Sequence, residues 1–424
     1  MAMNAPAPSS PPHLDDTATG LPARRAAMRL LEAVLIKGET LEKAGAYCLS
    51  ALKGPADKAH AKAIAGESLR WLVDLDTLID GATKKPLDPH AKTRSVLRIM
   101  LAQALRLETP PHAVIASALP LLTGGQRRLA HGVFSALLKR NAALPDVPTL
   151  PENVQARWGE RAAAIAAGLA SPPPLDLQLK KSAETRERAE GMGAVSLAPG
   201  HLRLPRGTPV DRLPSYEEGA WWVQDLAASL PASLLGRGEG KRVLDLCAAP
   251  GGKTLQLAAA GWQVTALDIN ERRLERLREN LQRNGLEAEI VVADALAYTP
   301  GKAFDAILLD APCTATGTCR RHPDVLHRIG EDELSETTTL QAALLRRAVG
   351  WLPEGGTLVY AVCSLEEGEG AAQAARVALD PLPISASELP AGLQPTPEGW
   401  LRTDPGMLAE HGGLDGFFVA RWKK

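Results

Sequence analysis

Five short apolar runs in the C-terminal half constrain the fold of this chain more than any other feature. They read RVLDLC, WQVTALD, AEIVVAD, FDAILLD and GTLVYAV, and helical or glycine-rich stretches separate them. Strands that are apolar on both faces and alternate with helices are typical of a parallel sheet covered on both sides. The sequence therefore predicts a doubly wound α/β domain over residues 238–424, with a last strand in DGFFVARWKK.

The N-terminal part has a different periodicity. Apolar residues in RRAAMRLLEAVLIKG recur at helical spacing, and the same spacing returns around Leu97 and Leu129. We expect an all-α domain over residues 21–145. Prolines gather in PDVPTLPEN and SPPPLDLQLKKSAE, so residues 146–237 are predicted to form a linker and a small α+β module. Residues 1–20, rich in Pro, Ser and Ala, are predicted to be a disordered tail.

The overall composition narrows the class of protein. The chain has 424 residues, 45% of them hydrophobic and 23% charged, and a net charge of -1. This charge argues against a protein that coats nucleic acid by charge alone. The five cysteines show no paired framework, and neither a signal peptide nor an apolar run of about 18 residues is visible. We expect a cytoplasmic monomer in a reducing compartment.

The turn LDLCAAPGGKT joins the first strand of the α/β domain to a helix. Gly251 and Gly252 let the backbone approach a ligand closely. The turn is not a phosphate-binding GxxxxGK[ST] loop, and Pro250 interrupts a GxGxxG fingerprint. A tight strand–helix turn without any ligand would explain these residues equally well.

Aspartates at strand ends favour the ligand-binding interpretation. Asp268 closes the second strand, where ribose hydroxyls are bound in such sheets, and Asp294 and Asp310 close the third and fourth. The ligand could be a dinucleotide or S-adenosylmethionine. Pyrophosphate prefers a full glycine fingerprint, which Pro250 spoils, so we favour S-adenosylmethionine.

Two of the cysteines follow neighbouring strands. Cys313 comes after the fourth strand and Cys363 after the fifth, so both sulfurs should approach one pocket beside the methyl donor. Each alone would more often be a small buried hydrophobe, as we expect for Cys48 and Cys247. A thiolate that adds to carbon 6 of cytosine activates carbon 5 for methylation. Lys253 could favour the thiolate, and Asp310 could hold the N3/N4 edge of the ring.

These motifs carry a family resemblance. LDLCAAPGGKT, LLDAPCTATG, RRHPD and VYAVCSL, in this order, resemble the Nop/Sun family of RNA cytosine-5 methyltransferases, and most closely the B type of bacterial 16S ribosomal RNA methyltransferases. The resemblance is strong over residues 242–365. It is weaker over residues 24–143, which are similar to the NusB-like helical domain of that type. It implies an RNA-binding NusB-like domain followed by a Rossmann-like class I methyltransferase domain.

The resemblance also implies roles for single residues. It makes Cys363 the nucleophile, while Cys313 assists product release. DNA cytosine methyltransferases use the fourth-strand position instead, so spacing alone does not decide between the two. Two departures are Val362, where the family usually has Thr, and LQLK in place of its basic LR-N element. The residues that match the family's cofactor-binding positions are Cys247, Ala248, Ala249, Pro250, Gly251, Gly252, Lys253, Asp268, Asp294 and Asp310.

A basic cluster follows the Cys313 loop. Arg320, Arg321 and His322 in CRRHPDVLHR are predicted to contact RNA phosphates, although a solvated loop is an equal alternative. A metal site at Cys313, Cys319 and His322 is not predicted, because the spacing is not a zinc pattern. The target base must lie in a single strand or be flipped out. The expected partner is ribosomal RNA, free or within the small-subunit assembly particle.

Two other functions remain open from the residues. The first is a methyltransferase acting on nitrogen or oxygen with inert cysteines, against which DAPC speaks because nitrogen methylators often carry (D/N)PP(Y/F) there. The second is a non-catalytic RNA-binding assembly factor with a retained cofactor fold. Loss of the glycines or of Cys363 would favour it, and both are present.

Overall fold

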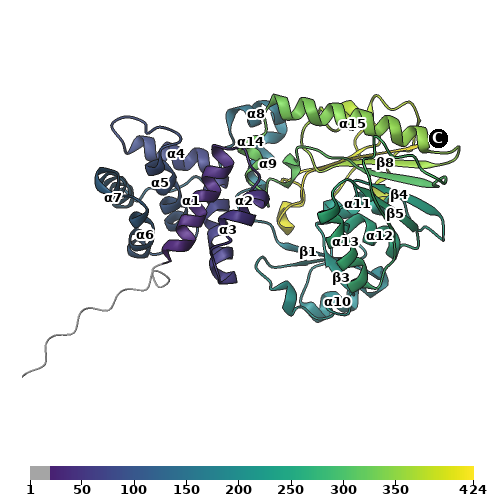
Figure 1. The fold of residues 1–424 in the computed structure, drawn as a ribbon, viewed down its shortest axis with the longest axis horizontal. Helices are drawn as coiled ribbons and strands as arrows, with labels where there is room; N and C mark the ends of the chain where they lie inside the picture. Colours follow the sequence, from purple (N-terminus) through teal and green to yellow (C-terminus); the bar gives the residue numbers. More distant parts are fainter. Residues whose placement is uncertain (1–19) are drawn as a thin grey trace, which may run out of the picture. The chain divides into compact units, whose positions relative to one another are not determined.

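A computed structural model describes residues 20–424, and the predicted disordered tail therefore lies almost entirely outside the described residues. The chain forms two compact units, one up to Thr149 and one from Leu150 to Lys424. The first is all-helical, and the second combines two sheets with helices (Figure 1). Among residues 20–424, no helix has the length and apolarity needed to cross a bilayer.

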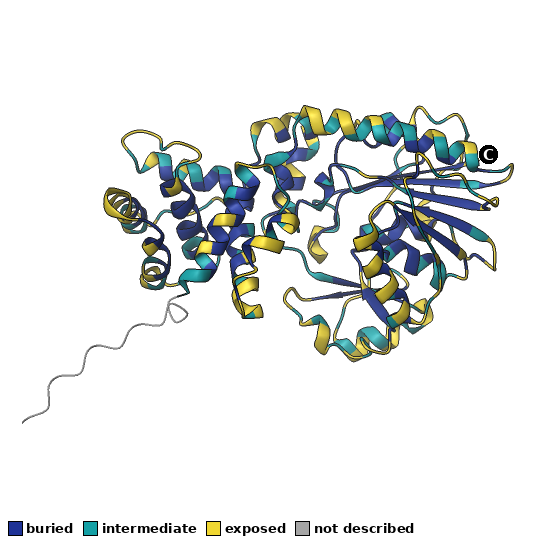
Figure 2. Ribbon diagram, viewed as in Figure 1, coloured by how far each residue is buried: buried dark blue, intermediate teal, exposed yellow. Residues whose placement is uncertain are grey.

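The first unit is a bundle of helices around one apolar core. In α1, the residues Ala27, Leu30, Leu31 and Val34 are buried, as their spacing predicts (Figure 2). The core continues through the other helices and includes Trp71 and Phe134. The helices are α1 Leu21–Leu35, α2 Leu41–Cys48, α3 Pro55–Arg70, α4 Leu72–Gly81, α5 Lys92–Leu105, α6 Pro111–Ala118 and α7 Gly124–Lys139.

A large mixed sheet forms the centre of the second unit. Its strand order is β10-β11-β8-β7-β4-β5-β6, and β9 pairs with β11. The strands from β6 to β8 run parallel, whereas β11 is antiparallel to β8. The predicted apolar runs are thus confirmed as one sheet. Its strands are β4 Arg242–Leu246, β5 Gln263–Asp268, β6 Glu289–Val292, β7 Ala306–Asp310, β8 Thr357–Val362, β9 Asp380–Pro381, β10 Leu401–Thr403 and β11 Phe417–Lys423.

Helices cover both faces of this sheet (Figures 1 and 2). Leu344 and Ala348 of α15 pack on one face, and α11, α12 and α13 lie on the other. The leucine stripe of α13, Leu274, Leu277 and Leu281, is buried, and Gly285 ends the helix in the left-handed conformation. These helices are α11 Leu226–Ser233, α12 Gly252–Ala259, α13 Glu271–Asn284, α14 Val325–Arg328, α15 Glu331–Trp351 and α16 Ala371–Ala374.

The residues before α11 form a smaller layer of the second unit. A three-stranded antiparallel sheet has the order β2-β1-β3, and its apolar side chains, including Leu177 and Trp221, form a core of their own. Two short helices, α8 and α9, pack against Leu326, Ile329 and Leu365 of the large domain. The elements are α8 Glu152–Trp158, α9 Ala162–Gly168, β1 Leu175–Leu179, α10 Thr185–Met192, β2 His201–Leu204 and β3 Trp221–Val223.

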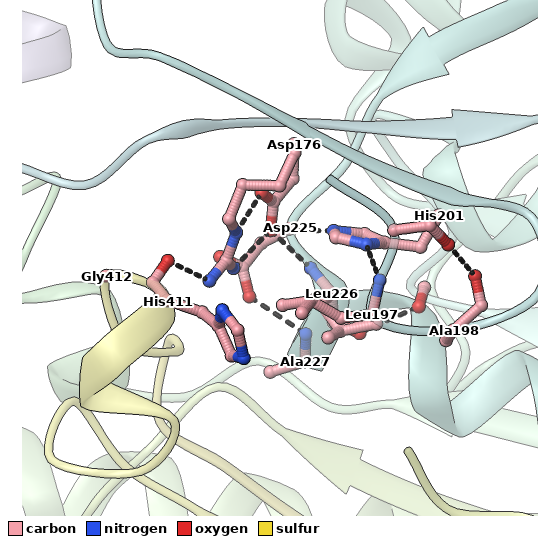
Figure 3. A network of polar contacts seen from close by, with 12 residues as sticks. Asp176, Leu197, Ala198, His201, Asp225, Leu226, Ala227, His411 and Gly412 are labelled. Carbon is pink, nitrogen blue, oxygen red and sulfur yellow. Dashed lines mark hydrogen bonds and ion pairs between the residues drawn. The ribbon is translucent and has the colours of Figure 1, made fainter. Parts of the chain in front are cut away.

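Buried charges join the small sheet to the large domain (Figure 3). Asp176 of β1 accepts two hydrogen bonds from Arg203, at 2.7 and 2.8 Å, and one from the backbone N–H of Leu226 at 3.0 Å. His201 Nε2 lies 3.3 Å from the same carboxylate. Burial would raise the pKa of Asp176, but the hydrogen bonds from Arg203 and His201 lower it. Arg203 also donates to the backbone carbonyl of His411, so one arginine binds both layers.

We predict that Leu277→Ala destabilises the second unit by about 2–5 kcal/mol, because it opens a cavity between α13 and the sheet. Denaturant unfolding of the full chain measures this loss. The matched control is Leu296→Ala, whose side chain is 40% exposed and should change the free energy of unfolding by less than about 0.5 kcal/mol. Equal effects of the two substitutions would contradict the assigned packing.

Candidate active site

The two cysteine loops meet at the carboxyl edge of the large sheet. Strands β7 and β8 pair in parallel, with Asp310 opposite Ala361, so the loops that follow them leave the sheet together. The Sγ atoms of Cys313 and Cys363 lie 3.4 Å apart. The sequence-based expectation that both sulfurs reach one place is confirmed.

An ion pair between the buried Lys253 and the partly exposed Asp310 lies near Cys363. Lys253 Nζ donates to Asp310 Oδ2 at 2.7 Å. Burial by itself would lower the pKa of Lys253, but the charge of Asp310 and its hydrogen bond raise it, with a smaller contribution from Cys363. Lys253 is therefore a retained cation whose field reaches Cys363.

The two thiols share a hydrogen bond in which either sulfur can be the donor. This hydrogen bond, followed by burial and the nearby carboxylate of Glu369, raises the pKa of Cys313 well above its usual range. A cation near Cys363 and a carboxylate near Cys313 make the two thiols electrostatically different.

A cavity of about 560 Å³ opens in front of these groups. Asp268, at the end of β5, accepts from the backbone N–H of Ala249 at 3.0 Å and so fixes the glycine turn. Gly251 has φ of 107°, and a Cβ there would lie 2.2 Å from Leu277 Cδ1, which explains the glycine. The predicted residues that line this cavity are Cys247, Ala249, Asp268, Asp294, Asp310, Cys313 and Cys363.

The rest of the turn faces a second cavity of about 330 Å³ that shares Asp310 with the first. Its predicted members are Ala248, Pro250, Gly251, Gly252 and Lys253. Cys247 is more than a core residue, since it lines the first cavity, and burial followed by the charges of Asp268 and Asp310 raises its pKa. Cys48 lies in the core of the helical unit, as expected.

Sequence reasoning did not assign several residues that line the first cavity, among them Ile269 and Arg273. Ile269, 70% exposed, lines it directly after Asp268 and offers an apolar surface to a flat ring. Arg273, in the first turn of α13, donates to the carbonyl of Ala249 and also lines the cavity. An exposed isoleucine directly after a strand-ending aspartate was the available signal.

Similarity to known proteins follows the same division of the chain. The family model for 16S rRNA methyltransferase RsmB/F matches residues 232–423, and the NusB family model matches residues 21–139. "Ribosomal RNA small subunit methyltransferase B" of Xylella fastidiosa (strain Temecula1) is 35% identical over 95% of this chain and 98% of its own. The protein of the same name from Xanthomonas campestris is 33% identical over 85% and 88%.

The chain belongs to the RsmB/F family of 16S rRNA methyltransferases. It is accordingly an S-adenosylmethionine-dependent methyltransferase with an N-terminal NusB domain.

Solved structures agree on the fold. The crystal structure of PH0851 has a TM-score of 0.67 over 95% of this chain and 99% of that one, and its 22% identity supports the fold alone. A methyltransferase homolog protein from Pyrococcus horikoshii is 26% identical, with a TM-score of 0.54 over 68% of this chain and 98% of that one.

The first cavity fits the family's cofactor. Its charged lining consists of Asp268, Asp294 and Asp310 against the single cation Arg273. Such a lining suits ribose hydroxyls and the positive sulfonium and ammonium groups of S-adenosylmethionine, and it would repel the phosphates of a dinucleotide. Asp268 and Asp294 would hold the adenosine part, and Ile269 would contact its ring.

Arg320 and Arg321, which were predicted to contact RNA, form ion pairs within the protein. Arg320 is fully buried, and its guanidinium binds Asp415 at 2.9 Å and Asp225 at 3.1 Å, so the prediction that it contacts RNA is wrong. Arg321 pairs with the same two carboxylates. Burial would lower the pKa of Arg321, but the charges of Asp415 and Asp225 raise it. His322 is exposed, and its contact with RNA stays a prediction.

A buried carboxyl below the site predicts a pH dependence. Asp245 is fully buried, and burial raises its pKa to about 7, even though Thr254 donates to it at 2.6 Å. The ordinary value is about 3.9, so between these pH values the folded state keeps a proton that the unfolded state loses. This contribution to stability is complete below about pH 4 and is lost as the pH rises to about 7.

We therefore predict that the wild-type chain loses stability relative to Asp245→Asn between pH 5 and pH 8, because the asparagine carries no titrating proton. Unfolding midpoints of both proteins in denaturant, measured at several pH values, give the difference. A difference that stays constant over this range would contradict a protonated Asp245.

Proposed function

We propose that this protein methylates carbon 5 of a cytosine in 16S ribosomal RNA, through a covalent bond between Cys363 and carbon 6. The observation that carries the proposal is the sulfur contact of 3.4 Å between Cys313 and Cys363, both of which line the first cavity. A pair of inert core cysteines would need neither a shared position at the cofactor cavity nor a buried cation beside it.

The electrostatic difference between the thiols supports Cys363 as the nucleophile. Its sulfur lies near the buried cation Lys253, whereas the sulfur of Cys313 lies near the carboxylate of Glu369. A nearby cation is the environment in which cysteines act as nucleophiles. Strand spacing alone left the choice between the two cysteines open, and the family resemblance pointed to the same residue.

The remaining steps follow from the chemistry of the ring. The Cys363 thiolate adds to carbon 6, and carbon 5 gains the electron density that makes it a nucleophile. S-Adenosylmethionine, when bound, supplies the electrophilic methyl group that carbon 5 takes. Asp310, held by Lys253, would bind the N3/N4 edge of the base. A base then takes the proton of carbon 5, the electron pair of that C–H bond re-forms the double bond to carbon 6, and Cys363 leaves as the thiolate, with Cys313 beside it to assist this release.

The substrate follows from the family and the helical domain. The relatives' names state that they methylate small-subunit ribosomal RNA. We propose the same substrate here, with the NusB domain adding RNA contacts and the target cytosine presented unstacked. We also propose that the protein acts in the cytoplasm, where such RNA is found.

We predict that Cys363→Ser abolishes methyl transfer while S-adenosylmethionine still binds, because the hydroxyl is a far weaker nucleophile than the thiolate. Transfer of labelled methyl to 16S RNA and calorimetric binding of the cofactor measure the two properties. Cys48→Ala, a change in the helical core, serves as the control and should keep activity. Retained turnover in Cys363→Ser would instead support methylation at nitrogen or oxygen.

We predict that Cys313→Ala accumulates a covalent protein–RNA adduct, because addition at carbon 6 proceeds while elimination is slowed. Denaturing gel electrophoresis with labelled RNA detects the adduct, and Cys313→Ala combined with Cys363→Ser should show none. An adduct-free Cys313→Ala enzyme with normal turnover would contradict assisted release.

A further inference from the structure

A buried glutamate outside the predicted site binds both cysteine loops. Glu369 lies between β8 and α16, and its side chain is fully buried. Its Oε1 accepts from the backbone N–H of Thr314 at 2.9 Å and from Gln341 Nε2 at 3.0 Å. Its Oε2 accepts from the hydroxyls of Thr314 and Ser364, both at 2.5 Å. Four donors therefore converge on one carboxylate.

Three of the four donors belong to the residues that directly follow the two cysteines. Thr314 follows Cys313 and Ser364 follows Cys363. Other bonds between the loops are Gly317 N–H to the carbonyl of Cys363 and Leu365 N–H to Thr316 Oγ1, both at 3.0 Å, and a contact of 3.2 Å between the hydroxyls of Thr316 and Ser364. Among the described residues, only Glu369 uses its side chain to bind both Thr314 and Ser364, the residues that follow the two cysteines.

We infer that Glu369 is a positioning residue that holds the sulfurs of Cys313 and Cys363 in contact. An ionised carboxylate only accepts hydrogen bonds, and its two oxygens offer about four acceptor sites, which matches the four donors. Glutamine has the same shape but carries no charge, and its amide N–H₂ could face the two hydroxyls only if both turned from donating to accepting. The loops would then lose the stronger, charge-assisted hydrogen bonds that the carboxylate accepts.

The carboxylate also acts on the proton of the pair. The charge of Glu369 is one of the influences that raise the pKa of Cys313, after the hydrogen bond with Cys363 and burial. One buried side chain thus holds both cysteine loops and also adds a negative charge near Cys313.

The consequence for turnover rests on the proposed function, whereas the geometry can be tested without RNA. Phenylarsine oxide condenses with two adjacent thiols, forming two As–S bonds and releasing water. We expect the full-length protein to be bridged at Cys313 and Cys363, seen as one arsenical per chain by mass spectrometry. Cys363→Ser should lose the adduct.

The decisive variant is Glu369→Gln, with Glu367→Gln as its matched control. Glu367 is two residues away, is exposed and pairs with Arg402. We expect Glu369→Gln to slow arsenical capture about tenfold and to lower kcat about 10²-fold, the effect of misplacing reacting groups by about 1 Å. Its cofactor affinity and KM for RNA should stay close to wild type, and Glu367→Gln should match wild type throughout.

Wild-type capture and kcat in a folded Glu369→Gln protein would overturn the inference. Should this variant not fold, Thr314→Val tests the same contact, because it removes one hydroxyl donor and keeps the backbone N–H. Intermediate slowing of capture in Thr314→Val supports the positioning role, and a wild-type rate overturns it. If arsenical capture is slow in Glu369→Gln while the wild-type enzyme makes no 5-methylcytosine, the positioning role is supported and the proposed reaction is refuted.

Discussion

Parallel pairing of β7 with β8 is the constraint on which the site depends. The hydrogen bonds of this ladder set Asp310 opposite Ala361, and the Ala311 N–H extends it to the carbonyl of Ala361 at 2.9 Å. Two loops that lie 50 residues apart in the chain leave the sheet at the same height. Every later feature of the site, from the sulfur contact to the shared carboxylate, requires that register, since a slip by one residue would turn the side chains to the opposite face.

Two groups of charged side chains near the carboxyl edge of the large sheet differ in their exposure to solvent. At the cavity, Lys253 and Asp310 form a pair whose carboxylate side chain remains partly exposed, so it can still meet a ligand. Arg320, Asp225 and Asp415 are sealed from solvent and bind each other. Buried pairs of this kind add little net stability, but removing one partner leaves an uncompensated charge and costs about 3–5 kcal/mol. Arg320, in the basic stretch after the Cys313 loop, therefore serves to hold separate segments of the fold together.

The sequence predicted well those features that local patterns encode. Apolar runs specified the strands of the large sheet, and the aspartates and cysteines that follow them necessarily reach its carboxyl edge. The features it did not predict depend on distant partners. Arg320 meets Asp225 and Asp415, each 95 residues away, and its burial leaves no trace in CRRHPDVLHR. Glu369 lies in LEEGEG, which reads as a solvated acidic loop, because its donors come from Thr314 and Gln341 as well as the nearby Ser364.

The buried contacts between the segment before α11 and the large sheet affect where the chain can be truncated. The segment that matches the methyltransferase family begins at residue 232, yet Asp225 and the helices α8 and α9 precede it. A fragment that begins at residue 232 would keep Arg320 but lose Asp225, one of its two carboxylate partners. It would also lose α8 and α9 and so expose the apolar residues Leu326 and Ile329. The match to the family and the compact unit therefore begin at different residues, because the second unit starts at Leu150.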